Sequence, residues 1–279
     1  MPQQIDLMSG QNPIIVLRYK AEIPNGNAIV LSAALGALQT FYTKFATFLS
    51  KEGYDVYTYD YSGIGLSRQA KIRTIKTSTT TWGKDDMRVV VEYVLNTKPE
   101  KLILMGQSIG AQLIAYCPLS SSADLIVNIV GSSGSYTLWN GWMRYAAYLN
   151  FASLKFINSI FGYFPGKTLG IMEDLPSGVA KEWSTWGLSP NYLFDIVPDA
   201  FAKAASLNKP LISYSVADDT SSPQQSVEWL NAQFKNCDLL YRHILPSNYN
   251  IKALGHFGFF RSKSQVLWEL LLEDIKLKS

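Results

Sequence analysis

The sequence predicts an α/β fold in which a mostly parallel central sheet is covered by helices on both faces. Short runs rich in β-branched and aromatic residues alternate with longer helical stretches, which is typical of parallel strands joined by helical crossovers. Two runs, at 101–105 and 124–130, are apolar along almost their whole length, as are strands buried on both faces. With 279 residues, 47% hydrophobic and 17% charged, the chain can bury a large core and is too apolar to be disordered.

The individual elements follow from local periodicity. Residues 38–51 give a clear helical pattern, because Phe41, Phe45 and Phe48 recur at helical spacing and Gly53 ends the helix. Predicted strands cover residues 13–19, 28–33, 54–59, 101–105, 124–131, 209–216 and 238–245. Predicted helices cover residues 38–51, 84–96, 108–117, 223–235 and 263–276.

Residues 136–206 interrupt this alternation. The interval is too long for a simple connection between strands, and from Tyr136 to Phe194 it holds 14 of the 36 aromatic residues. We expect a helical cap or lid insertion here, with residues 1–135 and 207–279 forming the core domain. Its aromatic side chains either line a substrate pocket or form the ordinary core of a helical layer, and the pattern leaves both interpretations open.

Composition argues against several classes of function. The net charge is only +3 and no stripe of Lys or Arg occurs, so we expect no nucleic-acid partner. Cys117 and Cys237 are too few for a disulfide framework or a zinc cluster, and His243 and His256 are too few for a multi-histidine metal site. We expect no cofactor. The sequence contains neither a secretory signal pattern nor a run of 18 apolar residues, which favours a cytoplasmic protein without a transmembrane segment; its oligomeric state stays open.

A candidate nucleophile, Ser108, stands in a G-x-S-x-G motif at residues 106–110. The motif follows the predicted strand 101–105 and begins the predicted helix 108–117, a context in which a sharp turn exposes the serine side chain. The flanking glycines allow strand and helix to approach closely. The amide of Ile109 would lie at the start of the helix, where an anion is favoured.

Two aspartates qualify as the carboxylate that such a serine requires. A serine hydroxyl is a weak nucleophile and needs an imidazole base, whose tautomer is held by a carboxylate. Asp218 and Asp219 follow the strand 209–216, and residues beyond the carboxyl end of a parallel strand face the crevice where ligands bind. One of the two could instead cap the helix that begins at Pro223.

The choice of base is between two histidines. His256 lies between Gly255 and the sequence Phe257-Gly258, in a turn after the last predicted strand. His243 falls inside the strand 238–245, where a histidine is more often structural or exposed to solvent. We therefore expect His256 to be the base.

These motifs resemble those of the α/β-hydrolase superfamily. Residues 106–110, Asp219 and His256 match its nucleophile, acid and base in order and context. Residues 59–67 (YDYSGIGLS) resemble the D-x-R-G-x-G-x-S turn of its lipase, esterase and serine-aminopeptidase-like branch. Residues 255–261 resemble the histidine loop of a poorly characterised bacterial subgroup of predicted hydrolases. The resemblance covers most of the chain.

The resemblance also implies roles for particular residues. In the family the acid often stands four residues before a proline that begins the next helix, which favours Asp219 because Pro223 follows it. The family's oxyanion hole would be formed here by the backbone amides of Leu35 and Ile109. Residues 33–36 read Ala-Ala-Leu-Gly where the family commonly has His-Gly-x-Gly.

The function that the resemblance implies is that of a serine hydrolase acting on an ester or related acyl substrate through an acyl-enzyme. The aromatic insertion suggests a small-molecule substrate with an apolar acyl or aryl group. A serine-aminopeptidase-like amide hydrolase is an alternative, with three acidic residues available to bind a substrate amino terminus: Glu173, Asp174 and Glu182. A protein with this fold that only binds a ligand or partner is another.

Overall fold

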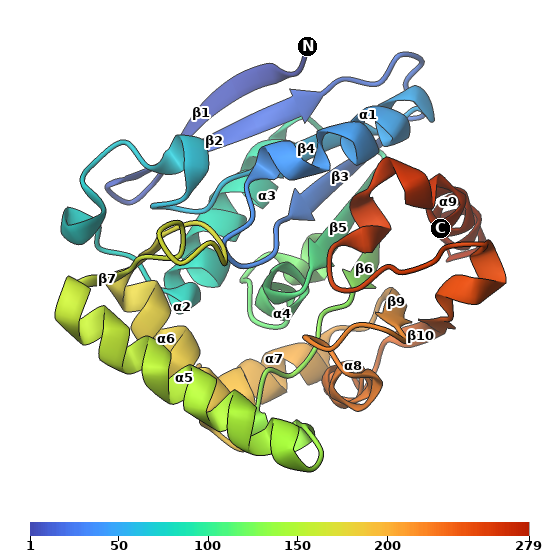
Figure 1. The fold of residues 1–279 in the computed structure, drawn as a ribbon. Helices are drawn as coiled ribbons and strands as arrows, with labels where there is room; N and C mark the ends of the chain where they lie inside the picture. The colour runs from blue at the N-terminus through green and yellow to red at the C-terminus, as the bar shows by residue number, and fades with distance from the viewer. Residues whose placement is uncertain (279) are drawn as a thin grey trace.

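The computed structural model describes residues 1–278 and is built around an eight-stranded sheet with helices on both sides (Figure 1). The strand order is β1-β2-β4-β3-β5-β6-β9-β10. The strands are β1 (Gln3–Ser9), β2 (Asn12–Tyr19), β3 (Asn27–Ser32), β4 (Asp55–Tyr59), β5 (Lys101–Gln107), β6 (Leu125–Ile129), β9 (Pro210–Val216) and β10 (Asp238–Ile244). All neighbours from β4 to β10 are parallel, so the predicted fold class is confirmed.

The one strand of this sheet without a sequence prediction is β1. It pairs antiparallel with β2, which is itself antiparallel to β4, so one edge of the sheet departs from the parallel arrangement. Most residues of β1 are polar or exposed, as expected for an edge strand that contacts the core on one side only.

Helices form at all five predicted positions, and two of them, predicted at 108–117 and 223–235, end three to four residues earlier than predicted. The segment predicted at 38–51 starts with a 3-10 turn at Gln39–Tyr42 and continues as α1 (Thr43–Lys51). The segment predicted at 84–96 contains a π-helical turn before α3 (Met87–Asn96). The other three predicted helices correspond to α4 (Ile109–Ile114), α8 (Gln224–Asn231) and α9 (Gln265–Lys278).

An aromatic cluster joins α1 to the C-terminal part of the chain. Phe45 of α1 packs edge-to-face on Phe260 and on Trp268 of α9, with ring centroids 5.0 and 5.4 Å apart. Tyr42 packs on Phe260 in the same way, at 4.9 Å. Because Phe260 lies four residues after His256, this cluster anchors the turn in which that histidine lies.

Residues 136–206 contribute no strand to the main sheet. The segment connects β6 to β9 and contains three α-helices, two short 3-10 helices and a small two-stranded sheet. The α-helices and strands are α5 (Trp142–Phe161), β7 (Tyr163–Phe164), β8 (Leu175–Pro176), α6 (Ser177–Gly187) and α7 (Ala200–Ser206). In Figure 1, α5 lies at the outer edge of the molecule, against α6, which in turn contacts the short helix α2 (Thr79–Thr81). None of the helices in residues 1–278 combines the length and apolar character needed to cross a membrane.

Candidate active site

Ser108 occupies the turn between β5 and α4. Its φ of 53° and ψ of −118° lie in a region that residues other than glycine rarely adopt, at a cost of about 1–3 kcal/mol. Backbone hydrogen bonds hold the turn: the Ser108 amide donates to Ile129 (3.0 Å), and the Ser108 carbonyl accepts from Ala111 (3.1 Å). Ser108 itself lines a cavity.

The two glycines of the motif are required by close approach of the backbone. A Cβ atom at Gly106 would lie 2.2 Å from the amide nitrogen of Ala111. A Cβ atom at Gly110 would lie 2.3 Å from the carbonyl oxygen of Ser32, at the end of β3. The G-x-S-x-G spacing therefore lets α4 start directly against the sheet.

Asp219 and His256 form a hydrogen-bonded pair beside this turn. Nδ1 of His256 lies 2.7 Å from Oδ2 of Asp219, whose side chain is fully buried. The other carboxylate oxygen accepts hydrogen bonds from the amides of Ser221 (2.9 Å) and Ser222 (3.1 Å).

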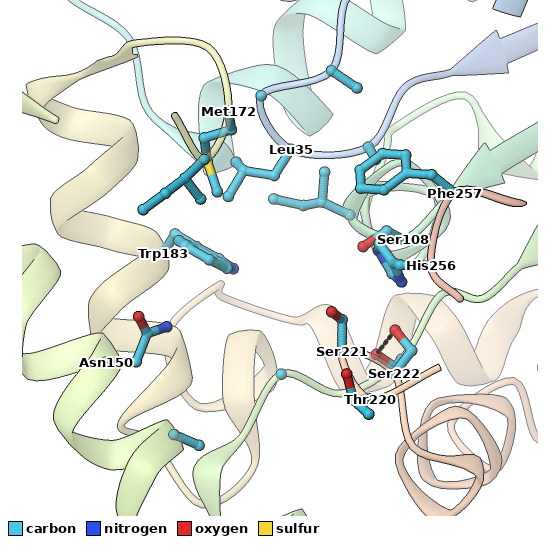
Figure 2. A pocket seen from close by; sticks show the side chains of 18 of the residues that line it. Leu35, Ser108, Asn150, Met172, Trp183, Thr220, Ser221, Ser222, His256 and Phe257 are labelled. Carbon is cyan, nitrogen blue, oxygen red and sulfur yellow. Dashed lines mark hydrogen bonds between the residues drawn. The ribbon is translucent and has the colours of Figure 1, made fainter. Parts of the chain in front are cut away.

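Ser108 and His256 both line the cavity, and their side chains overlap in the view of Figure 2. Among residues 1–278 no hydrogen bond joins these two side chains, whereas Gln107, next to Ser108, donates to the His256 carbonyl. With Nδ1 engaged by the carboxylate, Nε2 is the ring nitrogen left for a proton transfer.

The neighbouring aspartate holds the backbone of the histidine turn instead. The Asp218 carboxylate accepts hydrogen bonds from the amides of Leu254 (2.9 Å) and Gly255 (3.0 Å). It does not cap the following helix, since α8 begins after Pro223 without a side-chain cap. The sequence left a capping role open, and the structure gives each aspartate a different contact with the histidine turn.

His243 lies elsewhere, within β10 as predicted. Its Nδ1 is 2.7 Å from the hydroxyl oxygen of Ser215 on β9, and that hydroxyl also contacts Tyr241 at 2.6 Å. Ser215 is fully buried, so this second serine–histidine pair packs between strands.

Two residues near Ser108, Leu35 and Ile109, line the cavity and have backbone amides without a protein acceptor among residues 1–278. The amide before Leu35, that of Ala34, donates to the hydroxyl of Tyr42 at 2.9 Å. Gly36 has a φ of +65°, which lets the loop turn away after Leu35. Free, preorganised N–H groups of this kind can stabilise a developing oxyanion.

Two residues near the site were missed by the sequence analysis, Tyr42 and Gln107. The Tyr42 hydroxyl donates to Oε1 of Gln107 (2.6 Å), and Nε2 of Gln107 donates to the carbonyl oxygen of His256 (2.7 Å). Complete burial raises the pKa of Tyr42 far above its usual value, so its hydroxyl stays protonated. The polar Gln107 between a buried strand and Ser108 was the available signal; nothing in the local pattern singled out Tyr42.

The cavity has a volume of about 960 Å³ and a largely apolar wall. The part of the chain outside 136–206 supplies Leu35, Phe41 and Phe257, and residues 136–206 supply Trp142, Met143, Phe151, Met172 and Trp183. Several hydroxyl groups gather at one side of the cavity (Figure 2), where Ser132 and Ser222 form a hydroxyl pair at 2.9 Å near Thr220 and Ser221. The amide side chain of Asn150 lies across the cavity from them.

The three acidic residues considered as sites for a substrate amino terminus have partners within the protein. Glu173 pairs with Lys167 at 3.0 Å, and Asp174 pairs with Arg68 at 3.5 Å. Glu182 accepts hydrogen bonds from Thr79 and Thr80 of α2. Only Glu173 lines the cavity.

Comparison with known families gives a match over half of the chain. Residues 24–169 match a family described as serine aminopeptidase, S33. The matched range includes the G-x-S-x-G motif, the Leu35 loop and α5. No curated protein matches the chain.

Solved structures share the architecture at low identity. A monoglyceride lipase from Saccharomyces cerevisiae is 13% identical, with a TM-score of 0.72 over 98% of this chain and 95% of that one. A carboxylesterase of the Thaumarchaeon Nitrososphaera gargenis is 13% identical, with a TM-score of 0.66 over 98% of both chains. A monoacylglycerol lipase from Paleococcus ferrophilus is 16% identical, with a TM-score of 0.63 over 95% of this chain and 99% of that one. At these identities the likeness establishes a common fold.

Proposed function

The chain belongs to the serine aminopeptidase S33 family of α/β-hydrolases, and on that basis we propose that it is a serine hydrolase that cleaves an ester or a related acyl substrate. The observation that carries the proposal is the Asp219–His256 hydrogen bond beside Ser108, at the wall of an apolar cavity. The esterase and lipase neighbours are consistent with it.

The proposed mechanism assigns one step to each of the named groups. Oγ of Ser108 attacks the acyl carbon while Nε2 of His256 takes its proton, and Asp219 holds the opposite ring nitrogen. The amides of Leu35 and Ile109 stabilise the oxyanion of the tetrahedral intermediate. His256 then protonates the leaving alcohol, and water hydrolyses the acyl-enzyme by the reverse sequence of proton transfers.

The substrate in this proposal is a neutral ester with an apolar acyl group. Residues 136–206 serve as a cap in this account, over a core of residues 1–135 and 207–279, since their aromatic and aliphatic side chains supply much of the cavity wall. An acyl chain fits such a wall, and a neutral polar leaving group fits the hydroxyls of Ser132, Thr220 and Ser221. An aminopeptidase activity is less favoured, because Glu173 is neutralised by Lys167.

Labelling by a fluorophosphonate probe tests the nucleophile. We expect wild type to be labelled and Ser108→Ala to remain unlabelled. Ser215→Ala is the matched control, because it removes the other serine that is hydrogen-bonded to a histidine, and it should be labelled like wild type. Equal labelling of Ser108→Ala and wild type would refute the assignment. Retained ligand binding by an unlabelled, inactive wild type would instead indicate a non-catalytic binding protein.

Parallel assays separate esters from amides. Purified protein should hydrolyse p-nitrophenyl acyl esters and leave aminoacyl p-nitroanilides with a free amino terminus intact. Faster turnover of the aminoacyl amides would favour the aminopeptidase alternative.

A further inference from the structure

The outer side of α5 exposes a row of large apolar side chains. Five of them are between 61 and 77% exposed: Trp142, Tyr145, Leu149, Phe156 and Ile160. At 100° per residue they fall within an arc of about 60° around the helix axis. The helix is 20 residues long, so the row extends over roughly 25–30 Å. Monomeric proteins rarely leave so continuous an apolar face exposed to water without a partner.

This exposed row continues into the wall of the cavity. Trp142, at the start of the row, and Ile171, in the loop between β7 and β8, are both exposed and both line the cavity that contains Ser108. A partner that covers α5 would therefore lie at an apolar entrance to the site. From a partner that is itself an apolar phase, apolar molecules could enter the cavity directly.

The charges around the row have one sign. Between Tyr136 and Met172 the charged residues are Arg144, Lys155 and Lys167, and none is acidic. Lys167 is neutralised by Glu173, whereas Arg144 and Lys155 are exposed and form no ion pair within residues 1–278. On the helix they lie within about 20° of each other and about 80–100° from Tyr145, the nearest member of the apolar row. The Arg144 guanidinium lies over the ring of Tyr136, 5.4 Å from its centroid.

We propose that this face of α5 rests on the surface of a bilayer that contains anionic phospholipids. The apolar row enters the boundary between head groups and acyl chains, and Arg144 and Lys155 contact the anionic head groups. A second copy of the chain is a poorer occupant, because two such faces would bring like charges together. The docking itself does not depend on catalysis; that the acyl substrate enters from the bilayer past Trp142 rests on the proposed hydrolase function.

Co-sedimentation with vesicles tests the docking. The 279-residue Ser108→Ala protein should bind vesicles of phosphatidylcholine and phosphatidylglycerol at a 7:3 ratio, and bind vesicles of phosphatidylcholine alone more weakly. The double variant Leu149→Ser/Phe156→Ser should bind the mixed vesicles about 10- to 100-fold less tightly. The double variant Arg144→Gln/Lys155→Gln should lose the preference for anionic lipid. Ile23→Ser is the matched control, because Ile23 is 82% exposed but lies between β2 and β3, and it should bind like the parent protein.

Hydrolysis of a short, water-soluble ester checks that the double variant is folded. Leu149 and Phe156 do not line the cavity. In a protein that retains Ser108, their replacement should therefore leave this activity unchanged. Failure of all proteins to bind vesicles, or equal binding by Leu149→Ser/Phe156→Ser and Ile23→Ser, would overturn the docking proposal. A dimer on size-exclusion chromatography that only Leu149→Ser/Phe156→Ser disrupts, without vesicle binding, would overturn it in favour of a second copy. Because binding is measured with Ser108→Ala, its outcome is independent of the proposed catalytic function.

Discussion

The side-chain amide of Gln107 donates a hydrogen bond to the carbonyl oxygen of His256 over 2.7 Å, although 149 residues separate the two in sequence. Gln107 also accepts from Tyr42, which in turn accepts from the amide of Ala34. This buried chain links three loops of the site: the turn of Ser108, the turn of His256 and the loop of Leu35. Such a network is a means of fixing catalytic groups to the precision that catalysis needs.

Replacing Tyr42 by Phe should slow the reaction more than it weakens substrate binding. The change removes both hydrogen bonds of the hydroxyl and releases the loop before Leu35, so we expect kcat to fall roughly 10- to 100-fold with little change in KM. Tyr116→Phe is the matched control, because it removes another buried hydroxyl, bonded to the Thr79 carbonyl. Both variants should lose about 1–3 kcal/mol of unfolding free energy, but only Tyr42→Phe should lose kcat. Similar activity of the two variants would argue against a positioning role.

The two histidines should respond differently to alanine substitution. His256→Ala removes the proposed base and should lower kcat by a factor on the order of 10³ or more. His243→Ala removes a ring that contacts Ser215 between strands and should keep most of the activity. Steady-state kinetics on a p-nitrophenyl ester make the comparison, and the reverse ranking would show that the base is assigned to the wrong ring.

Substitution of the two adjacent aspartates should also have different effects on activity. Asp219→Asn disrupts the carboxylate contact to Nδ1 of His256 and should lower kcat by on the order of 10⁴. Asp218→Asn weakens the hydrogen bonds that the amides of Leu254 and Gly255 donate to this side chain. It should lower the unfolding free energy by about 1 kcal/mol and should reduce kcat far less than Asp219→Asn does. Kinetics and urea denaturation of both variants test this. Comparable kinetic defects would mean that Asp218 contributes to catalysis as much as its neighbour.

The sequence predicted most of the sheet, because parallel strands buried on both faces form apolar runs that can be recognised locally. The edge strand β1 has no such run, since most of its side chains are polar or exposed. The helix predicted at 108–117 is shorter as α4, which ends at Ile114. Boundaries of this kind depend on tertiary contacts that a single periodicity does not encode.

Part of the candidate site was predictable for a different reason. Ser108 stands in a motif whose glycines are demanded by backbone contacts, and a choice between two histidines left His256 as the one in a turn. The chain from Tyr42 through Gln107 was not predictable, because its members meet across 65 and 149 residues of sequence. No local pattern distinguishes a buried tyrosine that packs from one that also positions a loop.

The conformation of Ser108 predicts a stability difference between two substitutions at this position. At a φ of 53°, alanine retains the strain of a Cβ atom, whereas glycine relieves it. Ser108→Gly should therefore unfold at a Tm roughly 2–4 °C above that of Ser108→Ala. Ser226→Gly and Ser226→Ala are the control pair, because Ser226 lies inside the helix α8. There the alanine variant should be the more stable of the two. A lower Tm for Ser108→Gly than for Ser108→Ala would mean that the turn is not strained.

The buried carboxyl of Asp86 predicts how stability depends on pH. One of its oxygens accepts from the amide of Ser62 (2.8 Å), while the other has no partner within residues 1–278. Burial raises the pKa of this group to about 6, compared with about 3.9 in an unfolded chain. Between these two values the folded protein binds more protons than the unfolded chain, so the free energy of unfolding falls as pH rises from about 4 to 6.

An asparagine at this position should remove that contribution. Asp86→Asn can still accept from Ser62 and carries no charge, so its stability relative to wild type should increase between pH 4 and pH 7 by on the order of 2–3 kcal/mol. Urea denaturation of both proteins at several pH values measures this difference in unfolding free energy. The contributions of all other titrating groups, which the two proteins share, cancel in the difference. Asp85→Asn removes an exposed carboxylate from the same helical turn, whose repulsion makes only a small contribution to the raised pKa of Asp86. This variant should therefore keep most of the wild-type pH dependence. A difference between Asp86→Asn and wild type that stays constant with pH would show that Asp86 titrates alike in the folded and unfolded chains.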